Sequence, residues 1–375
     1  MGHHIDWLTI INELPQLFPC LVFFHYLCIM NEQFYEILRS ELWQQPLTSI
    51  TLSPAEVGAY IDEAKKQSVA GLFCNSLVSN DIHIGKELTL KALAIVNKVS
   101  KGNRKRNFDV GKFSSFLKRH DIPFVIVKGQ SVAALYPHPE LRQSGDIDVY
   151  CGEAHFIEAR DEIAKKTDLH FDPAIPVKHL AFSIDGSKYE LHRILSIFSY
   201  PKHQRFFNEK MEKALVNHDE IVINGVGVPV LAPTDSVFFQ TVHIFYHVIK
   251  EGIGLRQLCD LAVFMDKTQE RIDFSLLLSD LKKIGLEEFF QAIVHILTTQ
   301  LGWQIRVSTF IPRYTKLAEK ILNDVNDGGN FGKALEENRV WVILRHYLKY
   351  FSYAPKEILC IPLEKFSRRW RGVVS

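Results

Sequence analysis

The chain has 375 residues, of which 47% are hydrophobic, and its 44 basic and 43 acidic side chains leave a formal net charge of +1. This length and composition suffice for the cores of two or three compact units. Because the net charge is close to zero, no overall electrostatic field attracts nucleic acid or an anionic membrane, and any polyanion has to be met by a local patch.

An apolar run, LPQLFPCLVFFHYLCIM, occupies positions 14–30. No basic residue precedes this run, no small-residue cleavage site closes it, and it is short for a membrane span. An amphipathic pattern that includes Phe34 and Ile37 begins at Met30. We interpret residues 1–29 as an apolar extension that precedes the native start. The alternatives are a core-packing helix and a membrane element, and no membrane association is expected.

Residues 30–107 are predicted to form an N-terminal helical region. Ser53 is an expected helix cap, since a proline follows at the first helical position and Glu56 lies in the first turn. Apolar residues recur at spacings of three and four over 61–77 and 87–99, which predicts further helices. A basic segment follows, which we interpret as the solvated face of a helix or a connector rather than a phosphate-binding patch. It comprises Lys98, Lys101, Arg104, Lys105 and Arg106.

Residues 108–230 change to short strands and helices, which predicts a small mixed α/β domain. A Gly-containing dipeptide, Asp185-Gly186, joins two extended segments and is typical of a tight hairpin turn. The predicted elements, in chain order, are a helix at 113–119, a strand at 123–127, a short helix at 130–136, a strand at 146–150, a helix at 153–166, and extended segments at 181–184 and 188–194.

Residues 231–375 are predicted to form a C-terminal helical domain. Its expected helices are 233–250, 255–265, 274–284, 286–301 and 314–323. The expected fold class is therefore α+β, with a small mixed α/β core flanked by N-terminal and C-terminal helical regions.

The six cysteines are scattered and include no CxxC pair. This distribution fits reduced, mostly buried thiols better than a disulfide framework or a zinc site, so we expect a cytoplasmic protein. They are Cys20, Cys28, Cys74, Cys151, Cys259 and Cys360.

Two carboxylates alternate with aliphatic residues along the second predicted strand. Successive side chains of a strand point to opposite faces, so Asp146 and Asp148 are expected on one face. Carboxylates held side by side repel each other, and a fold tolerates this mainly when a cation lies between them. The pair therefore predicts a site for Mg²⁺ or Mn²⁺ that serves phosphoryl chemistry.

Glu190 is the best candidate for a third carboxylate, on the later hairpin strand. His192 shares its face of that strand, which places it near the same site. An exposed strand that alternates polar and apolar residues is the alternative interpretation.

The turn after the first predicted strand has the residue types of a phosphate-binding turn. Gly129 allows the chain to turn tightly and brings backbone N–H groups near a triphosphate, with the following helix N-terminus helping. Lys128 offers a cation, Ser131 a hydroxyl, and Arg142 a guanidinium to the same phosphates. For Arg142 the alternative is an ion pair with one of the two aspartates.

Two pairs of residues spaced four apart lie in the predicted C-terminal helices. His243 and His247 have a metal-ligand spacing, but without the Glu of a His-Glu-x-x-His motif they are interpreted as core or pocket-lining histidines. Arg256 and Asp260 are expected to form an ion pair within one helix. A role for both pairs in a substrate pocket is the alternative.

The order of strand, Gly-x-Ser turn, helix, Asp-x-Asp strand and later carboxylate strand resembles the nucleotidyltransferase superfold related to DNA polymerase β. The fuller string VKG…LYPHPELRQSGDIDVY…ELH is similar to a group of bacterial proteins termed uncharacterised nucleotidyltransferases. The segments MNEQFYEILRSELW and GIGLRQLCDLA also look typical of that group, so the resemblance covers nearly everything after residue 30.

The resemblance implies a role for particular residues. Gly129 and Ser131 fill the phosphate turn, Asp146 and Asp148 form the metal pair, and Glu190 is the third carboxylate. The usual superfamily motif is hydrophobic-Gly-(Gly/Ser), whereas this chain has a glutamine at the last position. This departure weakens the transfer of phosphate-binding detail more than that of the metal site.

The function expected from these features is metal-dependent nucleotidyl transfer, of the EC 2.7.7 type. The enzyme would move a nucleoside monophosphate from an NTP to a hydroxyl-bearing acceptor and release pyrophosphate. A small molecule or a protein or peptide side chain is favoured over RNA as acceptor, because the chain is nearly neutral. The alternatives are an inactive protein that binds a nucleotide or a partner, and a kinase-like transferase of the γ-phosphoryl group.

Overall fold

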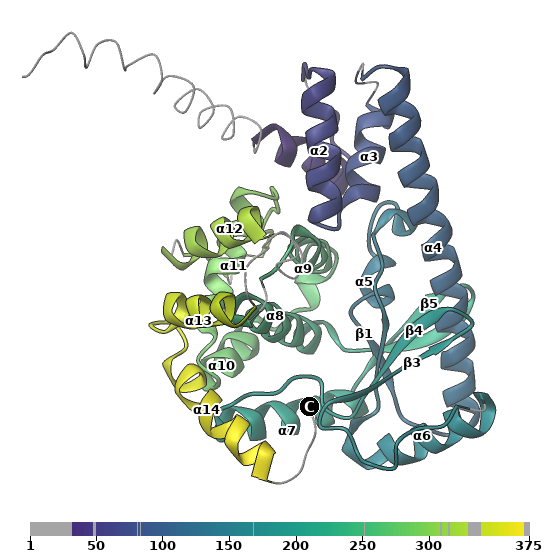
Figure 1. Ribbon diagram of the computed structural model, residues 1–375, viewed down its shortest axis with the longest axis vertical. Coiled ribbons are helices and arrows are strands. Elements are labelled where there is room, and N and C mark those ends of the chain that lie inside the picture. The colour runs from purple at the N-terminus through teal and green to yellow at the C-terminus, as the bar shows by residue number, and fades with distance from the viewer. Residues whose placement is uncertain are drawn as a thin grey trace, which may run out of the picture.

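The structure is a computed structural model that describes residues 32–370 except positions 48, 49, 81, 83, 168, 251, 308, 309, 314, 315 and 329–338. The interpretation of residues 1–29 therefore lies outside the described residues. A six-stranded mixed sheet lies between helices from both ends of the chain (Figure 1). This architecture confirms the α+β class with a mixed core flanked by N-terminal and C-terminal helical regions.

The N-terminal region consists of a helix over 32–43, α2 (Pro54–Lys66), α3 (Ala70–Ser79) and α4 (Lys86–Arg119). The expected cap of α2 is confirmed: the Ser53 hydroxyl accepts from the Glu56 backbone N–H, and the Glu56 carboxylate accepts from the Ser53 backbone N–H. The run over 61–77 is divided into two helices because Ser68 adopts a left-handed φ of 59°.

One helix of 34 residues, α4, replaces the separate helices that the periodicity predicts over 87–99 and 113–119. The basic segment lies inside it. The exposure of Lys98, Lys101 and Arg104 agrees with a solvated helix face. The second half of α4 passes position 108 and packs on the sheet, so a single helix joins the N-terminal helices to the α/β core (Figure 1).

The strand order in the sheet is β3-β4-β2-β1-β6-β5. Strand β2 pairs antiparallel with β1 and parallel with β4, while β1 pairs parallel with β6. The outer strands form two antiparallel hairpins, and the predicted tight turn is confirmed by the left-handed φ of Asp185 and Gly186, 51° and 77°. The strands are β1 (Val125–Val127), β2 (Ile147–Tyr150), β3 (His179–Ile184), β4 (Ser187–His192), β5 (Asp219–Ile223) and β6 (Val226–Val230).

The alternation of side chains gives the sheet one apolar face and one mixed face. Ile147, Val149 and Leu191 are buried in one cluster with the second half of α4 and with α6 (Gly152–Thr167). Residues between them in the sequence, including Asp148 and Glu190, consequently point to the opposite face. On that face Val127 belongs to a second cluster, which contains the buried side chains of the C-terminal helices. Asp148 and Glu190 therefore lie between the sheet and the C-terminal region.

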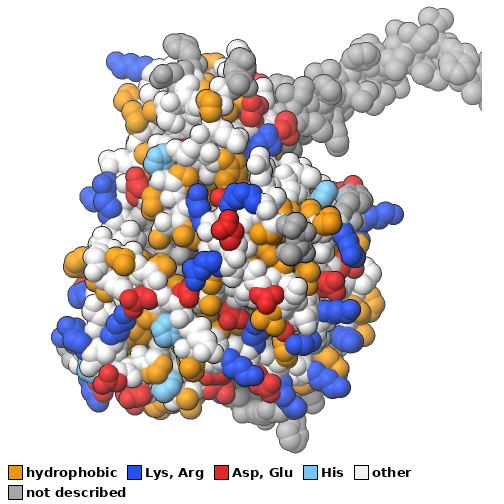
Figure 2. Space-filling view, turned by 180° about the vertical axis from the view of Figure 1, so that it is seen from behind, with side chains coloured by type: hydrophobic (Ala, Val, Ile, Leu, Met, Phe, Trp, Pro, Cys, Tyr) orange, Lys and Arg blue, Asp and Glu red, His pale blue; other side chains and the backbone are white. Residues whose placement is uncertain are grey.

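The C-terminal region begins with α8 (Pro233–Lys250), whose N-terminal and C-terminal bounds match the predicted helix. It continues with α9 (Leu255–Thr268), α10 (Phe274–Lys283), α11 (Glu287–Thr299), α12 (Lys316–Gly328), α13 (Arg339–Tyr350) and α14 (Pro355–Trp370). Two further helices connect the strands, α5 (Gln130–Ala133) and α7 (Pro201–Val216). Within the described ranges, no helix has both the length and the apolar run needed to cross a bilayer. Figure 2 shows basic and acidic side chains intermixed over the rear face.

Candidate active site

The turn that follows β1 is held in an unusual backbone conformation. Lys128 and Gly129 both have left-handed φ angles, 56° and 47°. The Ser131 hydroxyl donates to the Lys128 carbonyl over 2.7 Å, and the Ser131 N–H donates to the same oxygen over 2.9 Å. Ser131 thus stabilises the turn from beneath, while the Lys128 side chain extends over the sheet toward β2.

An acidic cluster lies on the two neighbouring strands β2 and β4. Asp148 and Glu190 are paired positions in the parallel register, so their side chains leave the sheet side by side. The Lys128 ammonium lies 3.0 Å from Asp148 Oδ1. Nε2 of His192 lies 2.9 Å from the same oxygen and 3.2 Å from Glu190 Oε2. Asp146 directly precedes β2, is exposed, and lines the same cavity.

The two inner carboxylates are ionised at neutral pH. Burial raises the pKa of Asp148, but the Lys128 ammonium and the hydrogen bond from His192 outweigh burial and lower the pKa below its ordinary value. For Glu190, burial and the neighbouring Asp148 charge raise the pKa, and the hydrogen bond from His192 leaves a net lowering. The cluster therefore presents negative oxygen ligands, the form that binds divalent cations.

His179, on the neighbouring strand β3, also belongs to this cluster. Its Nε2 lies 3.6 Å from Glu190 Oε1, and its ring packs against that of His192 with the ring centroids 5.0 Å apart. Burial lowers the pKa of His179 to about 4, so the imidazole is neutral. Potential ligand atoms of His179, Glu190 and His192 all lie within 4.8 Å of one another, which is close enough to share one metal ion.

A cavity of about 420 Å³ opens above these strands, between the sheet and helices α8 and α9. Most of the side chains proposed from the sequence line it, whereas Ser131 lies beneath the turn and His192 beneath the two carboxylates. The proposed residues that line it are Lys128, Gly129, Arg142, Asp146, Asp148, Glu190, His243, His247, Arg256 and Asp260.

Several lining residues were not proposed from the sequence, among them the polar side chains Lys178, His179 and Gln240. His179 could have been found by counting the hairpin register outward from the Asp185-Gly186 turn, because it pairs with His192. Lys178 lies just before the same strand. Gln240 lies one turn before His243 on α8. Because this helix is largely apolar, its sequence did not indicate that Gln240 would line a cavity.

Asp260 forms a different ion pair from the one that the i,i+4 spacing predicts. Asp260 pairs with Arg142 rather than with Arg256, through Nε–Oδ1 and Nη2–Oδ2 contacts of 2.6 Å each. The Tyr136 hydroxyl donates to the same carboxylate over 2.8 Å. Arg256 donates to the Gln143 carbonyl over 3.4 Å. The alternative interpretation of Arg142, an ion pair with Asp146 or Asp148, is not what the structure shows, because its guanidinium is committed to Asp260.

His243 and His247 line the cavity wall formed by α8, with their ring centroids 4.4 Å apart. Burial and the nearby Lys128 charge lower the pKa of both, to about 3 for His247 and well below the ordinary value for His243. Both imidazoles are therefore neutral at physiological pH and can accept or donate hydrogen bonds in the cavity.

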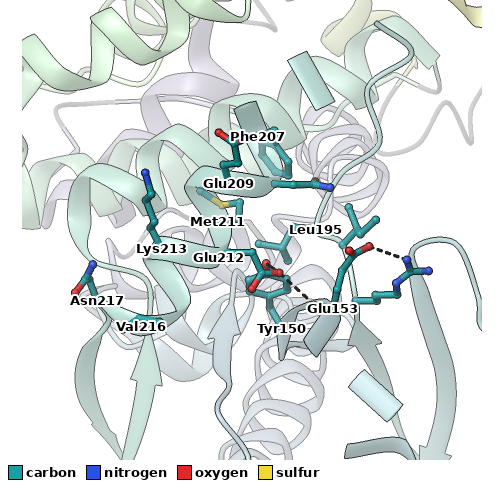
Figure 3. Close-up of a pocket in the computed structure, with 13 residues that line it drawn as sticks. Tyr150, Glu153, Leu195, Phe207, Glu209, Met211, Glu212, Lys213, Val216 and Asn217 are labelled. Carbon is teal, nitrogen blue, oxygen red and sulfur yellow. Dashed lines mark hydrogen bonds and ion pairs between the residues drawn. The ribbon is translucent and has the colours of Figure 1, made fainter. Parts of the chain in front are cut away.

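A second hollow of about 630 Å³ lies at the C-terminal end of β2, beside α7 (Figure 3). Two of its carboxylates are engaged by other lining residues. The Glu212 carboxylate accepts from the Tyr150 hydroxyl over 3.0 Å, and Glu153 pairs with Arg193 over 2.7 Å (Figure 3). The first cavity, in which Asp148 and Glu190 leave neighbouring strands at one register position, is the better candidate for chemistry.

Comparisons with known proteins identify a family and a similar solved structure. Among solved structures, an antigenic nucleotidyltransferase-like protein from Paracoccidioides brasiliensis is similar at 15% sequence identity, with a TM-score of 0.30, over 54% of this chain and 94% of that chain. No curated protein sequence matches. Residues 53–302, which include the whole sheet and both cavity-forming helices α8 and α9, match the family described as uncharacterised nucleotidyltransferase, and the chain belongs to this family.

Proposed function

We propose that the protein is a divalent-metal-dependent nucleotidyltransferase, built on the superfold related to DNA polymerase β, that transfers a nucleoside monophosphate from an NTP to a hydroxyl-bearing acceptor. The family supports nucleotidyl transfer as the general role. The observation that carries the finer proposal is the pairing of Asp148 with Glu190 at one register position, with Asp146 on the rim of the same cavity.

The donor set fits a divalent cation. Asp148 and Glu190 are ionised and converge on one face, and Asp146 adds an exposed carboxylate. The Lys128 ammonium, 3.0 Å from Asp148, shows that this position already attracts positive charge. Asp146, Asp148 and Glu190 would hold Mg²⁺ or Mn²⁺. When bound, the metal neutralises charge on the triphosphate and favours ionisation of the acceptor hydroxyl.

The protein's own groups have complementary tasks in the transfer. Glu190 lies at the cavity wall and accepts the proton of the acceptor hydroxyl, whose oxygen then attacks the α-phosphorus. The bond from the α-phosphorus to its bridging oxygen breaks, and pyrophosphate leaves. Lys128 and the Gly129 turn are placed to meet the departing negative charge, Arg142 lines the same cavity, and Ser131 fixes the shape of the turn.

The acceptor is proposed to be a small molecule or a protein or peptide side chain. The cavity of about 420 Å³ is of the size that small ligands occupy, and it lies between the sheet and the C-terminal helices. His243, His247 and Gln240 supply neutral polar groups on its far wall. A cytoplasmic location is proposed as well, since Cys74, Cys151 and Cys259 are buried free thiols.

One contact favours a second candidate function, a protein on the same fold that no longer catalyses transfer. In such a protein the Lys128 ammonium would remain the permanent counter-ion of Asp148 instead of giving way to a metal. The two candidates differ in whether divalent cations bind to the carboxylates.

Calorimetric titration of Mg²⁺ and Mn²⁺, with and without a non-hydrolysable NTP, tests the proposal. We expect metal binding that strengthens with the nucleotide and is lost in Asp148→Asn. Asp121→Asn is a matched control, because Asp121 is exposed at a left-handed φ of 54° that asparagine tolerates. Equal metal binding by the wild type and Asp148→Asn would rule out the carboxylate site.

A further inference from the structure

Arg142 has one guanidinium nitrogen that is buried and without a hydrogen-bond partner among the described residues. Its Nε and Nη2 are both committed to Asp260, whereas Nη1 makes no bond. The residue is only 3% exposed and lines the cavity. Since a buried N–H without a partner costs free energy comparable to a lost hydrogen bond, this nitrogen is suited to a ligand atom.

Arg256 presents a second donor of the same kind. It lies in the first turn of α9, and its Nε is buried without a partner among the residues that the structure describes. Its Nη1 makes only a long contact of 3.4 Å with the Gln143 carbonyl. Gly145 passes close by: a Cβ built there would lie 3.7 Å from Arg256 Nη1, within ordinary van der Waals contact. The guanidinium is thus placed at the cavity wall without a strong anchor.

The two arginines differ in their direct contacts with carboxylates. Asp260 is bound bidentately to Arg142, whereas Asp260 and Asp148 act on Arg256 only through their charges. Burial and the proximity of Arg142 lower the pKa of Arg256. A guanidinium group does not lose its proton in proteins, so this repulsion persists unless an anion is bound.

We propose that Arg142 and Arg256 together form an anion subsite for a phosphate or carboxylate group of a ligand. Planar guanidinium forks match these two groups in geometry and charge, and both orphaned donors border one cavity. This subsite deepens the proposed function. It rests on that function in one respect only, namely that the ligand is a substrate of nucleotidyl transfer. The anion is either the triphosphate of the NTP or an acidic group on the acceptor.

The test uses inorganic phosphate as the probe, titrated calorimetrically in EDTA at low ionic strength, so that no metal contributes. Arg256→Gln is the informative variant, because it removes a weakly anchored charge and leaves the Arg142–Asp260 pair intact. We expect it to weaken phosphate binding at least about tenfold, as for loss of a charged hydrogen bond. Arg256→Lys keeps the charge but loses the planar guanidinium fork. Its phosphate affinity should lie between those of the wild type and Arg256→Gln. Arg205→Gln, at an exposed position on α7, is the matched control and should bind as the wild type does.

A competition experiment identifies the origin of the anion. If the triphosphate occupies the subsite, ATP displaces phosphate, and Arg256→Gln also weakens ATP binding. If the subsite serves the acceptor, phosphate binds equally well with ATP present, and Arg256→Gln leaves ATP binding unchanged.

Two results would overturn the subsite: no phosphate binding by the wild type, or unchanged phosphate binding in Arg256→Gln. Because metal is absent from this titration, its outcome is separate from that of the proposed function. Loss of metal binding or of nucleotidyl transfer in Asp148→Asn does not bear on it.

Discussion

Lys128 and Asp148 are joined by an ion pair of 3.0 Å between the end of β1 and the neighbouring strand β2. The pair places an ammonium group against the carboxylate that is best positioned to bind a metal. The left-handed turn at Lys128 and Gly129 directs the side chain to this place. In the proposed enzyme, Asp148 would hold the divalent cation and the Lys128 ammonium would pair with the triphosphate.

Lys128→Met tests this arrangement. Removing the ammonium leaves the acidic cluster without its internal counter-ion, so nucleotide-free protein should bind Mn²⁺ several-fold more tightly. The same substitution should weaken NTP binding roughly tenfold, because a charge-assisted phosphate contact is lost. Calorimetric titration measures both affinities. Weaker Mn²⁺ binding in the variant would show that Lys128 does not compete with the metal.

Asp148→Asn should reduce nucleotidyl transfer by roughly 100-fold or more, because metal stabilisation of transition-state charge amounts to several kcal/mol. Its folding should be largely preserved, since asparagine retains the shape and can still accept from Lys128. The rate is measured as transfer of α-label, and circular dichroism verifies the fold. Transfer at the wild-type rate would contradict the assignment of Asp148 as a metal ligand.

The sequence predicted the central strands well because their signals are local. Alternation in Asp146–Val149 placed the carboxylates on one face, and the Asp185-Gly186 turn fixed the hairpin that carries Glu190. Neither feature depends on the rest of the chain. The position of Asp146 just outside β2 is a small departure that leaves it on the cavity rim.

Zn²⁺ should bind to His179, Glu190 and His192 more tightly than Mg²⁺, by roughly 100-fold, since imidazole ligands favour borderline transition metals. His179→Gln should remove most of this difference while leaving Mg²⁺ binding nearly unchanged. Metal content after dialysis against equal concentrations of the two ions provides the measurement. Equal Zn²⁺ content in the variant and the wild type would exclude His179 as a ligand.

Asp260→Asn should lower the free energy of unfolding by about 3 kcal/mol, because it leaves the buried Arg142 guanidinium without its counter-ion. Urea unfolding followed by circular dichroism measures the change. As a contrast, Arg306→Gln breaks a half-exposed pair with Asp266 and should cost less than about 1 kcal/mol. If the free energy of unfolding fell equally in the two variants, the buried Arg142–Asp260 pair would stabilise the fold no more than the half-exposed pair does.

Stability should fall as the pH is lowered from 6.5 toward 3 in metal-free protein. The ordinary pKa of histidine is 6.5, and that of folded His247 is about 3. Between these values the unfolded chain binds more protons than the folded one, so acid favours unfolding, with a limiting slope of about 1.4 kcal/mol per pH unit for each such group. Urea unfolding at several pH values measures the slope. His247→Gln should flatten it, and the exposed His218→Gln should not; an unchanged slope in His247→Gln would refute the prediction.

Long-range packing explains what the sequence did not predict. The i,i+4 spacing of Arg256 and Asp260 is a weak signal on its own, and burial favours the bidentate Arg142–Asp260 pair across 118 positions. Likewise, the sequence left open whether the basic segment around Lys101 was a helix face or a connector, and α4 runs through it as one helix with Ser100 and Asn103 buried. Such contacts become visible only once the sheet and the C-terminal helices are placed together.

The central claim is transfer of a nucleoside monophosphate at the Asp146, Asp148 and Glu190 cluster. It is tested most directly by incubating the protein with each NTP, labelled at either the α- or the γ-phosphate, together with Mg²⁺ or Mn²⁺ and a cell extract as the source of acceptor. We expect α-label, and not γ-label, to enter a product, and we expect this labelling to require the metal and to be lost in Asp148→Asn. Transfer of γ-label into the product, or equal α-labelling by Asp148→Asn, would contradict it.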